Sequence, residues 1–187
     1  MDSVRVTPRV WKIKADGNMY VLDIDPKTVI DTGSRALMDL VVRELKKITS
    51  PDNIKQVIFT HLHYDHVGNA ELFRNAEFFA SKEAIEDFRK NDMDSVLNRE
   101  DAEALKKITL KEFDGNADLE LIKTPGHTRG SICIGFPEER VIFTGDTVLK
   151  GGYGRTDLPT SVPEKMSQSI QKVLNYDYIV LCPGHEY

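Results

Sequence analysis

The sequence predicts an α/β protein in which two β-sheets face each other and helices cover their outer faces. Strand-like and helix-like segments alternate along the chain, and both halves contain apolar runs of strand length as well as an amphipathic helix. A sheet and a helix each bury an apolar side, so such segments are stable when they pack in layers. Histidines follow the ends of several strand-like runs, which places a candidate site on loops at one edge of the sheets.

The N-terminal part of the chain is rich in strand-like segments. We expect strands within 4–14, 19–24 and 28–30, because these stretches alternate or are apolar. The turn sequences Asp16-Gly17-Asn18 and Asp25-Pro26 separate them. A strand-turn-strand opening of this kind predicts antiparallel pairing at the start of the first sheet.

A helix is expected next, over 34–48. Its apolar residues recur at three- and four-residue spacing, which is typical of a helix that packs one side on a core. Ser50-Pro51-Asp52 breaks this helix, and the apolar run Val57-Ile58-Phe59 then predicts a buried strand. The apolar positions of the helix are Leu37, Met38, Val41, Leu45 and Ile48.

The middle of the chain predicts helices around a short strand. We expect a helix after His66, up to Asn75, a strand over 77–80 and another helix over 81–90. Residues 91–107 are the most charged part of the chain but keep one apolar stripe, so we interpret them as a surface helix or helical lid. Such a segment is usually a solvated face, and it could also overhang the candidate site.

Strands return in the last third of the chain. Ser161 and Glu164 have the spacing of a capping box, which predicts a helix from there to about Asn175. A last buried strand is expected over 178–181. The preceding strands are expected over 110–113, 119–123, 131–136 and 140–143, with turn residues between them.

Composition limits the classes of function. The 187 residues suffice for one substantial core, so we expect a single domain over 1–187. A net charge of −5 gives no basic face for a phosphate backbone, which argues against a nucleic-acid partner. No secretory signal or membrane-spanning run is present, and Cys133 and Cys182 lie in apolar runs as reduced core residues. We therefore expect a cytoplasmic protein that acts on a small molecule; its oligomeric state is left open.

The stretch from Thr60 to His66 carries the strongest chemical signal. It packs three histidines and an aspartate directly after an apolar strand-like run, and in an extended backbone His61 and His63 point to the same side. Asp65 and His66 follow the turn and can face the same point. An ordinary polar turn is the alternative. However, the two remaining histidines of the chain, His127 and His185, both follow Pro-Gly turns after strand-like runs, so all five lie in ligand-like settings. Imidazoles and carboxylates suit zinc, iron or manganese.

These motifs, taken in order, resemble the metallo-β-lactamase superfamily. The residues concerned are His-x-His-x-Asp-His at 61–66, Gly-His at 127, Thr-Gly-Asp at 144–146, Gly-His at 185 and the turn Asp31-Thr32-Gly33. The resemblance extends from about residue 19 to the end of the chain and implies a four-layer αββα sandwich with the metal site at one edge of the two sheets.

The resemblance also implies a ligand set for two divalent metal ions, with zinc expected and iron or manganese as alternatives. His61, His63 and His127 correspond to the ligands of one ion, and Asp65, His66 and His185 to those of the second. Asp146 corresponds to a carboxylate that bridges both; by itself it could equally be a turn aspartate. Asp65 is also a candidate catalytic proton shuttle.

A second resemblance concerns the branch of the family. The segment 151–159, with Tyr153 and Arg155, resembles the Gly-Arg-Thr-Asp loop of glyoxalase II-like hydrolases and of persulfide dioxygenases, as does the ending Gly184-His185-Glu186-Tyr187. We therefore predict that Tyr153 and Arg155 contact substrate. The alternative for Arg155 is an ion pair with Asp157 in a surface loop.

The implied function is a hydrolase that cleaves a thioester or ester, similar to hydroxyacylglutathione hydrolase. The presence of Asp146 argues against a true β-lactamase, in which another residue type is expected. The alternatives are a lactonase and a mononuclear iron persulfide dioxygenase, which would use His61, His127 and Asp146. No C-terminal substrate-binding domain is expected, which puts glutathione recognition in doubt, and the terminal carboxylate of Tyr187 is expected near the site.

Overall fold

The computed structural model describes residues 2–186, and its strands form two sheets. Tyr187, whose carboxylate was expected near the site, lies outside the described residues. The strands are β1 (Ser3–Thr7), β2 (Val10–Ile13), β3 (Met19–Leu22), β4 (Thr28–Ile30), β5 (Gln56–Ile58), β6 (Glu77–Ala80), β7 (Leu110–Glu112), β8 (Glu120–Lys123), β9 (Ile132–Phe136), β10 (Val141–Gly145) and β11 (Val180–Pro183). The helices are α1 (Met38–Leu45), α2 (Tyr64–Val67), α3 (Lys82–Lys90), α4 (Asp92–Val96), α5 (Arg99–Leu105) and α6 (Pro163–Leu174).

Strand direction determines where the loops gather. The first sheet has seven strands in chain order, antiparallel from β1 to β4 and parallel from β4 to β7. The second has four strands in the order β11-β10-β9-β8, with β10 parallel to β11 and antiparallel to β9. The ends of parallel strands meet at one sheet edge. The loops after β4 and β5 therefore share an edge of the first sheet, as do those after β10 and β11 and the loop before β9 in the second.

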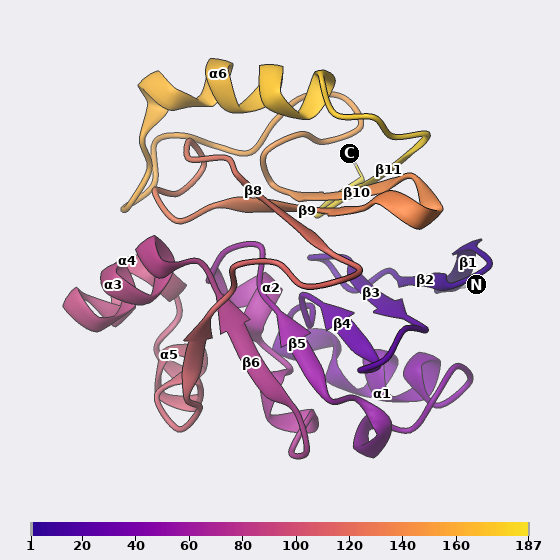
Figure 1. Cartoon of the computed structure of the whole chain (residues 1–187). Helices are drawn as coiled ribbons and strands as arrows, with labels where there is room; N and C mark the ends of the chain where they lie inside the picture. Colours follow the sequence, from indigo (N-terminus) through magenta and orange to yellow (C-terminus); the bar gives the residue numbers. More distant parts are fainter. Residues whose placement is uncertain (1, 187) are drawn as a thin grey trace.

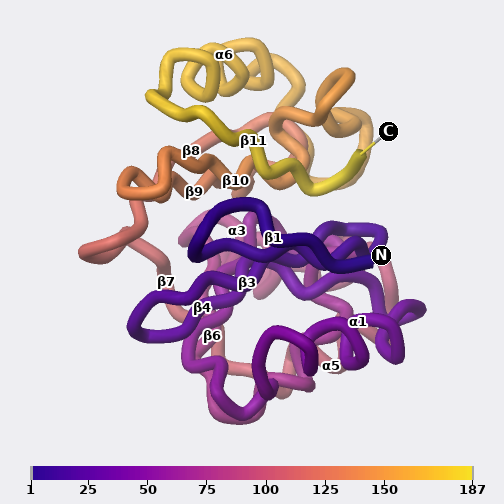
Figure 2. Tube along the Cα trace, turned by 90° about the vertical axis from the view of Figure 1, so that its right-hand side faces the viewer, coloured from indigo at the N-terminus to yellow at the C-terminus, as the bar shows by residue number. Residues whose placement is uncertain are grey.

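The sheets stack between two outer layers of helices, which confirms the predicted αββα sandwich (Figure 1). The helices α1 to α5 cover the outer face of the first sheet, and α6 covers that of the second (Figure 1). In the view at right angles, the end of β11 lies over the N-terminal strands (Figure 2). This contact is held by Tyr20, whose hydroxyl donates to the carbonyl oxygen of Pro183 at 2.7 Å.

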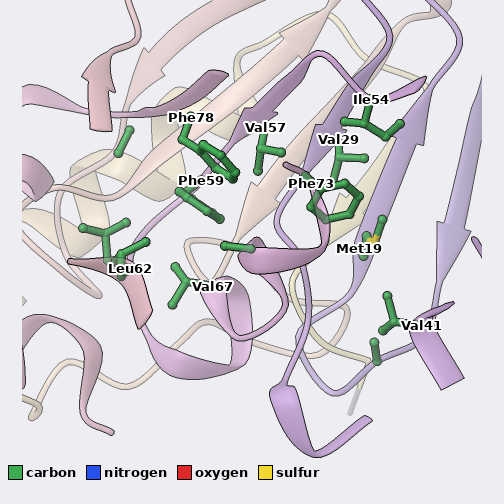
Figure 3. Packing of buried hydrophobic residues seen from close by; sticks show 14 of the residues in the cluster. Met19, Val29, Val41, Ile54, Val57, Phe59, Leu62, Val67, Phe73 and Phe78 are labelled. Atoms are coloured by element: carbon green, nitrogen blue, oxygen red, sulfur yellow. The ribbon is translucent and has the colours of Figure 1, made fainter. Parts of the chain in front are cut away.

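Three apolar cores correspond to the three interfaces of this sandwich. The largest lies between the first sheet and its helices, where Val57, Phe59 and Phe73 are fully buried (Figure 3). A second core fills the space between the sheets, with Ile58 on one side and Phe143 on the other. The third joins the second sheet to α6 through Cys133, Ile142 and Val173.

Several predicted elements differ in length. The expected strand over 4–14 is a hairpin that turns between β1 and β2, where Pro8 lacks the N–H that a continuous ladder needs. The expected helix over 34–48 is a 3₁₀ turn followed by the shorter α1. The last strand begins at Val180 instead of residue 178. These shifts leave the order of the elements as predicted.

The helix expected after His66, up to Asn75, is wrong over most of its length. Helix α2 begins earlier, at Tyr64, and ends at Val67. The side chain of Asn69 donates to the backbone oxygens of Thr32 at 2.8 Å and Ser34 at 3.0 Å, which ties the chain to the loop after β4. Asparagine side chains that bond to the backbone in this way compete with helical hydrogen bonding.

The predicted capping box at Ser161 and Glu164 is also wrong. Helix α6 begins at Pro163, its N-cap position is Val162, and no side chain caps it. The Ser161 hydroxyl instead donates to the backbone oxygen of His127 at 2.7 Å. A long-range hydrogen bond has therefore replaced the local one, and it fixes the loop that carries a candidate ligand.

The charged segment 91–107 forms the two short helices α4 and α5. Asn91 and Asn98 cap them by accepting hydrogen bonds from the backbone N–H groups of Met93 and Asp101, respectively. Between the helices Leu97 adopts a left-handed backbone conformation, with φ of 64°. The segment is thus a helical corner that packs on the first sheet through the buried Val96 and Leu105.

Both cysteines are free and buried, as predicted. Among residues 2–186, no helix has the length and apolar character needed to cross a bilayer.

Candidate metal centre

All seven predicted ligands lie together at one edge of the sandwich, although they come from five segments of the chain. His61 and His63 follow β5, and Asp65 and His66 belong to the first turn of α2. His127 lies on the loop before β9. Asp146 follows β10, and His185 follows β11. The strand directions described above bring these loops to the same edge.

The seven side chains form overlapping groups in which the ligand atoms lie within 4.8 Å of one another. Asp146 lies between the groups, because its Oδ2 is 3.5 Å from Nε2 of His127 while its Oδ1 is 3.4 Å from Nε2 of His66 and 3.5 Å from Nε2 of His185. Nε2 of His185 is also 3.2 Å from Oδ2 of Asp65. The groups are His61, His63 and His127; His61, His66 and Asp146; and Asp65, His66 and His185.

The donor atoms fit a pair of metal ions. Nε2 of His61, Nε2 of His66 and Oδ1 of Asp146 are buried and make no hydrogen bond with any described residue. Leaving buried polar atoms unpaired costs free energy, and such atoms turned toward a common point are expected where they bind an ion. Nitrogen and carboxylate oxygen donors are those that zinc, iron and manganese accept.

A second layer of hydrogen bonds orients these donors, and Asp31 is its centre. Nδ1–H of His66 donates to Oδ2 of Asp31 at 2.8 Å, which leaves Nε2 of His66 with a lone pair. Oδ2 of Asp31 also accepts from the Thr60 hydroxyl at 2.7 Å, and Oδ1 accepts from the Thr60 N–H at 2.8 Å. Because the Thr60 hydroxyl donates to Asp31, it accepts from Nδ1 of His61, at 3.1 Å. One carboxylate therefore sets the tautomers of two candidate ligands.

His127 is fixed in the same way by its own loop contacts. Its Nδ1–H donates to the backbone oxygen of Arg155 at 2.6 Å, which leaves a lone pair on Nε2, the atom that faces the other candidate ligands. The Ser161 hydroxyl described above holds the His127 backbone. The loop that was predicted to bind substrate through Arg155 thus also orients a candidate ligand.

The electrostatics of the site differ between its two sides. Burial lowers the pKa of His61 well below its ordinary value and that of His63 to about 3, and burial also lowers the pKa of His127. Neutral imidazole is the form that binds metal. On the other side, burial raises the pKa of Asp65, but the electrostatic interaction with His66 and the hydrogen bond with His185 outweigh burial and lower that pKa. The group of Asp65, His66 and His185 therefore contains an ionised carboxylate.

The loop between β2 and β3 also belongs to the site, although no motif in the sequence predicts this. The Asn18 N–H donates to the backbone oxygen of Gly184 at 2.7 Å, and its side chain donates to that of Pro183 at 3.0 Å. Gly17 passes directly against the backbone oxygen of Asp65. The available signal was the turn Asp16-Gly17-Asn18, but a turn sequence does not reveal what its backbone contacts.

The close approach of Gly184 explains the glycine before the last histidine. A Cβ at this position would lie 2.8 Å from Cε1 of His66 and would overlap Oδ1 of Asp146. Gly184→Ala should therefore displace the candidate bridging carboxylate and lower kcat/KM by about tenfold, with weaker metal retention. Gly152→Ala is the matched control, because no atom lies within 4 Å of a Cβ built there. Equal metal content and activity in the two variants would contradict this packing argument.

The seven candidate ligands lie beside a cleft of about 530 Å³. Tyr153 and Arg155, the residues for which substrate contacts are predicted, both line it. The Arg155 guanidinium, however, binds Asp157 with both Nε and Nη2 at 2.9 Å, which is the alternative considered above. Leu97, from the corner between α4 and α5, lines the same cleft, so the charged segment does reach the site. The lining residues are His63, Tyr64, Asp65, Leu97, His127, Asp146, Leu149, Tyr153, Gly154, Arg155, Leu158 and His185.

Comparison with known proteins places this site in a family. Residues 15–185 match the metallo-beta-lactamase superfamily. The chain is 34% identical over 161 residues to a probable metallo-hydrolase of Methanocaldococcus jannaschii, and this match covers 84% of the chain and 70% of the relative. It is 30% identical over 177 residues to the hydroxyacylglutathione hydrolase GloC of Haemophilus influenzae, covering 84% of the chain and 78% of the relative.

A solved structure agrees at the level of the fold. The protein TTHA1623, crystallised in a di-iron-bound form, superposes with a TM-score of 0.71 at 20% identity, over 100% of this chain and 93% of that one. The extent of the family match, the αββα layers and the identity to the archaeal relative lead to one conclusion: the chain belongs to the metallo-beta-lactamase superfamily.

Proposed function

We propose that this protein is a dinuclear metal-dependent hydrolase that cleaves a thioester or ester. The observation that carries the proposal is the position of Asp146 between two groups of ligand atoms, within 3.5 Å of His127 on one side and of His66 and His185 on the other. In this arrangement His61, His63 and His127 would hold one ion, and Asp65, His66 and His185 the second. The hydroxyacylglutathione hydrolase among the relatives supports this reaction class.

The side chains of the site would orient the ligands and transfer the proton in this mechanism. When bound, a pair of divalent metals supplies a hydroxide near neutral pH and polarises the substrate carbonyl. Asp31 and Thr60 hold the imidazoles in the tautomer that leaves Nε2 free. Asp65 lines the cleft among the candidate ligands, which supports its assignment as the group that would accept a proton and return it to the leaving group. No protein nucleophile is needed.

Metal analysis tests the proposal directly. Protein purified without added metal is expected to contain about two ions per chain by elemental analysis, zinc being the expected ion. Dialysis against a chelator should abolish thioester hydrolysis, and zinc, manganese or iron should restore it. One iron per chain, with oxygen uptake on a persulfide and no hydrolysis, would overturn the proposal and favour the dioxygenase. Hydrolysis of a lactone in preference to a thioester would change the substrate class but not the metal chemistry.

A further inference from the structure

The candidate substrate cleft is lined by two chemically different sets of residues. One set is the candidate ligands His63, Asp65, His127, Asp146 and His185. The other set includes Leu97, from the corner between α4 and α5, and Leu149 and Leu158, from the loop between β10 and α6. Small-molecule sites combine apolar lining with a few polar groups that fix orientation. These three leucines, called the leucine wall, are therefore available to recognise the substrate beyond its scissile bond.

A backbone hydrogen bond and buried neighbours fix the position of Leu97. Its N–H donates to the Met93 carbonyl at 2.9 Å in the left-handed turn that ends α4. The neighbouring Val96 is fully buried in the largest core. Helix α5, which follows, is tied to the body of the protein by Arg35, whose Nε donates to Oδ1 of Asp101 at 2.7 Å. The half-buried Leu97 side chain is thus presented to the cleft by an anchored corner.

The charges around the cleft argue against a substrate with distant carboxylates. Arg155 is the only lysine or arginine among the described residues that line the cleft, and its guanidinium is occupied by Asp157 in a two-pronged ion pair. Glutathione carries two carboxylates, and charge-assisted hydrogen bonds to both would need more cationic side chains than this lining contains. Burial of apolar surface is consequently the main source of binding free energy in this cleft away from the metal site.

We propose that the natural substrate is a thioester or ester with an uncharged hydrocarbon group beside the scissile carbonyl, and that Leu97, Leu149 and Leu158 bind this group. This inference rests on the function proposed above. Leu97 is its specificity-determining residue, since it comes from a segment that supplies none of the candidate ligands. On this proposal, lactoylglutathione is not the preferred substrate.

Two series of substrates test the inference with zinc-loaded protein. The first compares hexanoyl with acetyl thioesters of one small thiol, and the second compares acetyl thioesters of hexanethiol and ethanethiol. We expect kcat/KM to be at least about tenfold higher for the longer member of one series, because four additional methylene groups are partly buried. Neither series showing a preference, or lactoylglutathione being the best substrate, would overturn the inference.

Substitution of Leu97 locates the preference. Leu97→Asn should remove most of the chain-length preference, which is the ratio of kcat/KM for the longer and the shorter substrate of a series, and asparagine tolerates the left-handed backbone at this position. Leu174→Asn is the matched control, because Leu174 is 56% exposed on α6 and does not line the cleft. An unchanged preference in Leu97→Asn would contradict the assignment.

A binding measurement separates this inference from the proposed function. A non-hydrolysable ketone analogue with a hexanoyl chain can be titrated into wild type and Leu97→Asn by calorimetry, in the presence and absence of zinc. About tenfold weaker binding to the variant supports the leucine wall even where no thioester is cleaved. Equal affinities for the two proteins would overturn it even if hydrolysis is observed.

Discussion

Asp146→Asn should lower kcat/KM for a thioester by about 10³-fold and reduce the bound metal to one ion per chain or fewer. The carboxylate of Asp146 has ligand atoms of both groups within 3.5 Å, so its two oxygens are near enough to both groups to serve two ions. Asparagine keeps the shape but replaces one oxygen with a group that donates hydrogen bonds and cannot coordinate. The measurements are steady-state kinetics and elemental analysis of the same preparation.

Asp177→Asn serves as the control for this substitution. Asp177 is an exposed residue that pairs with Arg140 far from the cleft, so its replacement should leave metal content and kinetics unchanged. Two ions per chain in Asp146→Asn, with activity within about threefold of wild type, would show that the carboxylate is not a bridging ligand.

The candidate ligands could be predicted because each follows a strand whose apolar run is visible in the sequence. His61 follows β5, which lies parallel to β4, and Asp146 and His185 follow the parallel neighbours β10 and β11. Within each sheet, the loops that follow parallel neighbours lie at one edge. The order of the elements followed for the same reason, since layer packing leaves few arrangements for alternating strands and helices. Local periodicity and motif order therefore predicted the fold and the proximity of the seven candidate ligands.

What the sequence did not reveal depends on contacts between distant segments. The role of Asn18 arises from backbone bonds to Pro183 and Gly184, which no local pattern encodes. Ser161 has the spacing of a helix cap, yet its hydroxyl bonds to His127 because α6 begins two residues later. The position of Leu97 in the cleft likewise depends on how the α4–α5 corner packs on the sheet. At these residues, contacts between distant segments outweigh the structure that the local sequence favours.

Asp31 lies outside the candidate ligand set but makes three hydrogen bonds within the site. It is 2% exposed and adopts a left-handed backbone conformation with φ of 54°, which asparagine and aspartate tolerate better than other residues. Its oxygens accept hydrogen bonds from His66 and twice from Thr60. These contacts select the imidazole tautomers, so the residue positions the ligands without belonging to them.

Asp31→Asn tests this positioning role. An amide nitrogen in place of Oδ2 would donate to Nδ1 of His66, which moves the proton of His66 to Nε2 and removes the lone pair that faces the site. We expect metal affinity and kcat/KM to fall by roughly 10- to 100-fold while the far-ultraviolet circular dichroism is retained. Asp39→Asn, at an exposed aspartate in the first turn of α1, is the control.

Thr60→Val separates the two branches of this network. It removes only the hydroxyl that links Asp31 to His61 and leaves the bond from His66 to Asp31 intact. Metal titrations with a competing chelator should therefore show weaker binding at the group of His61, His63 and His127, with the second group less affected. Equal weakening of both ions, or none, would mean that Asp31 acts by holding the loop as a whole instead of by selecting tautomers. The combination of both variants decides between these roles, because only tautomer selection predicts that Asp31→Asn weakens both ions while Thr60→Val weakens one.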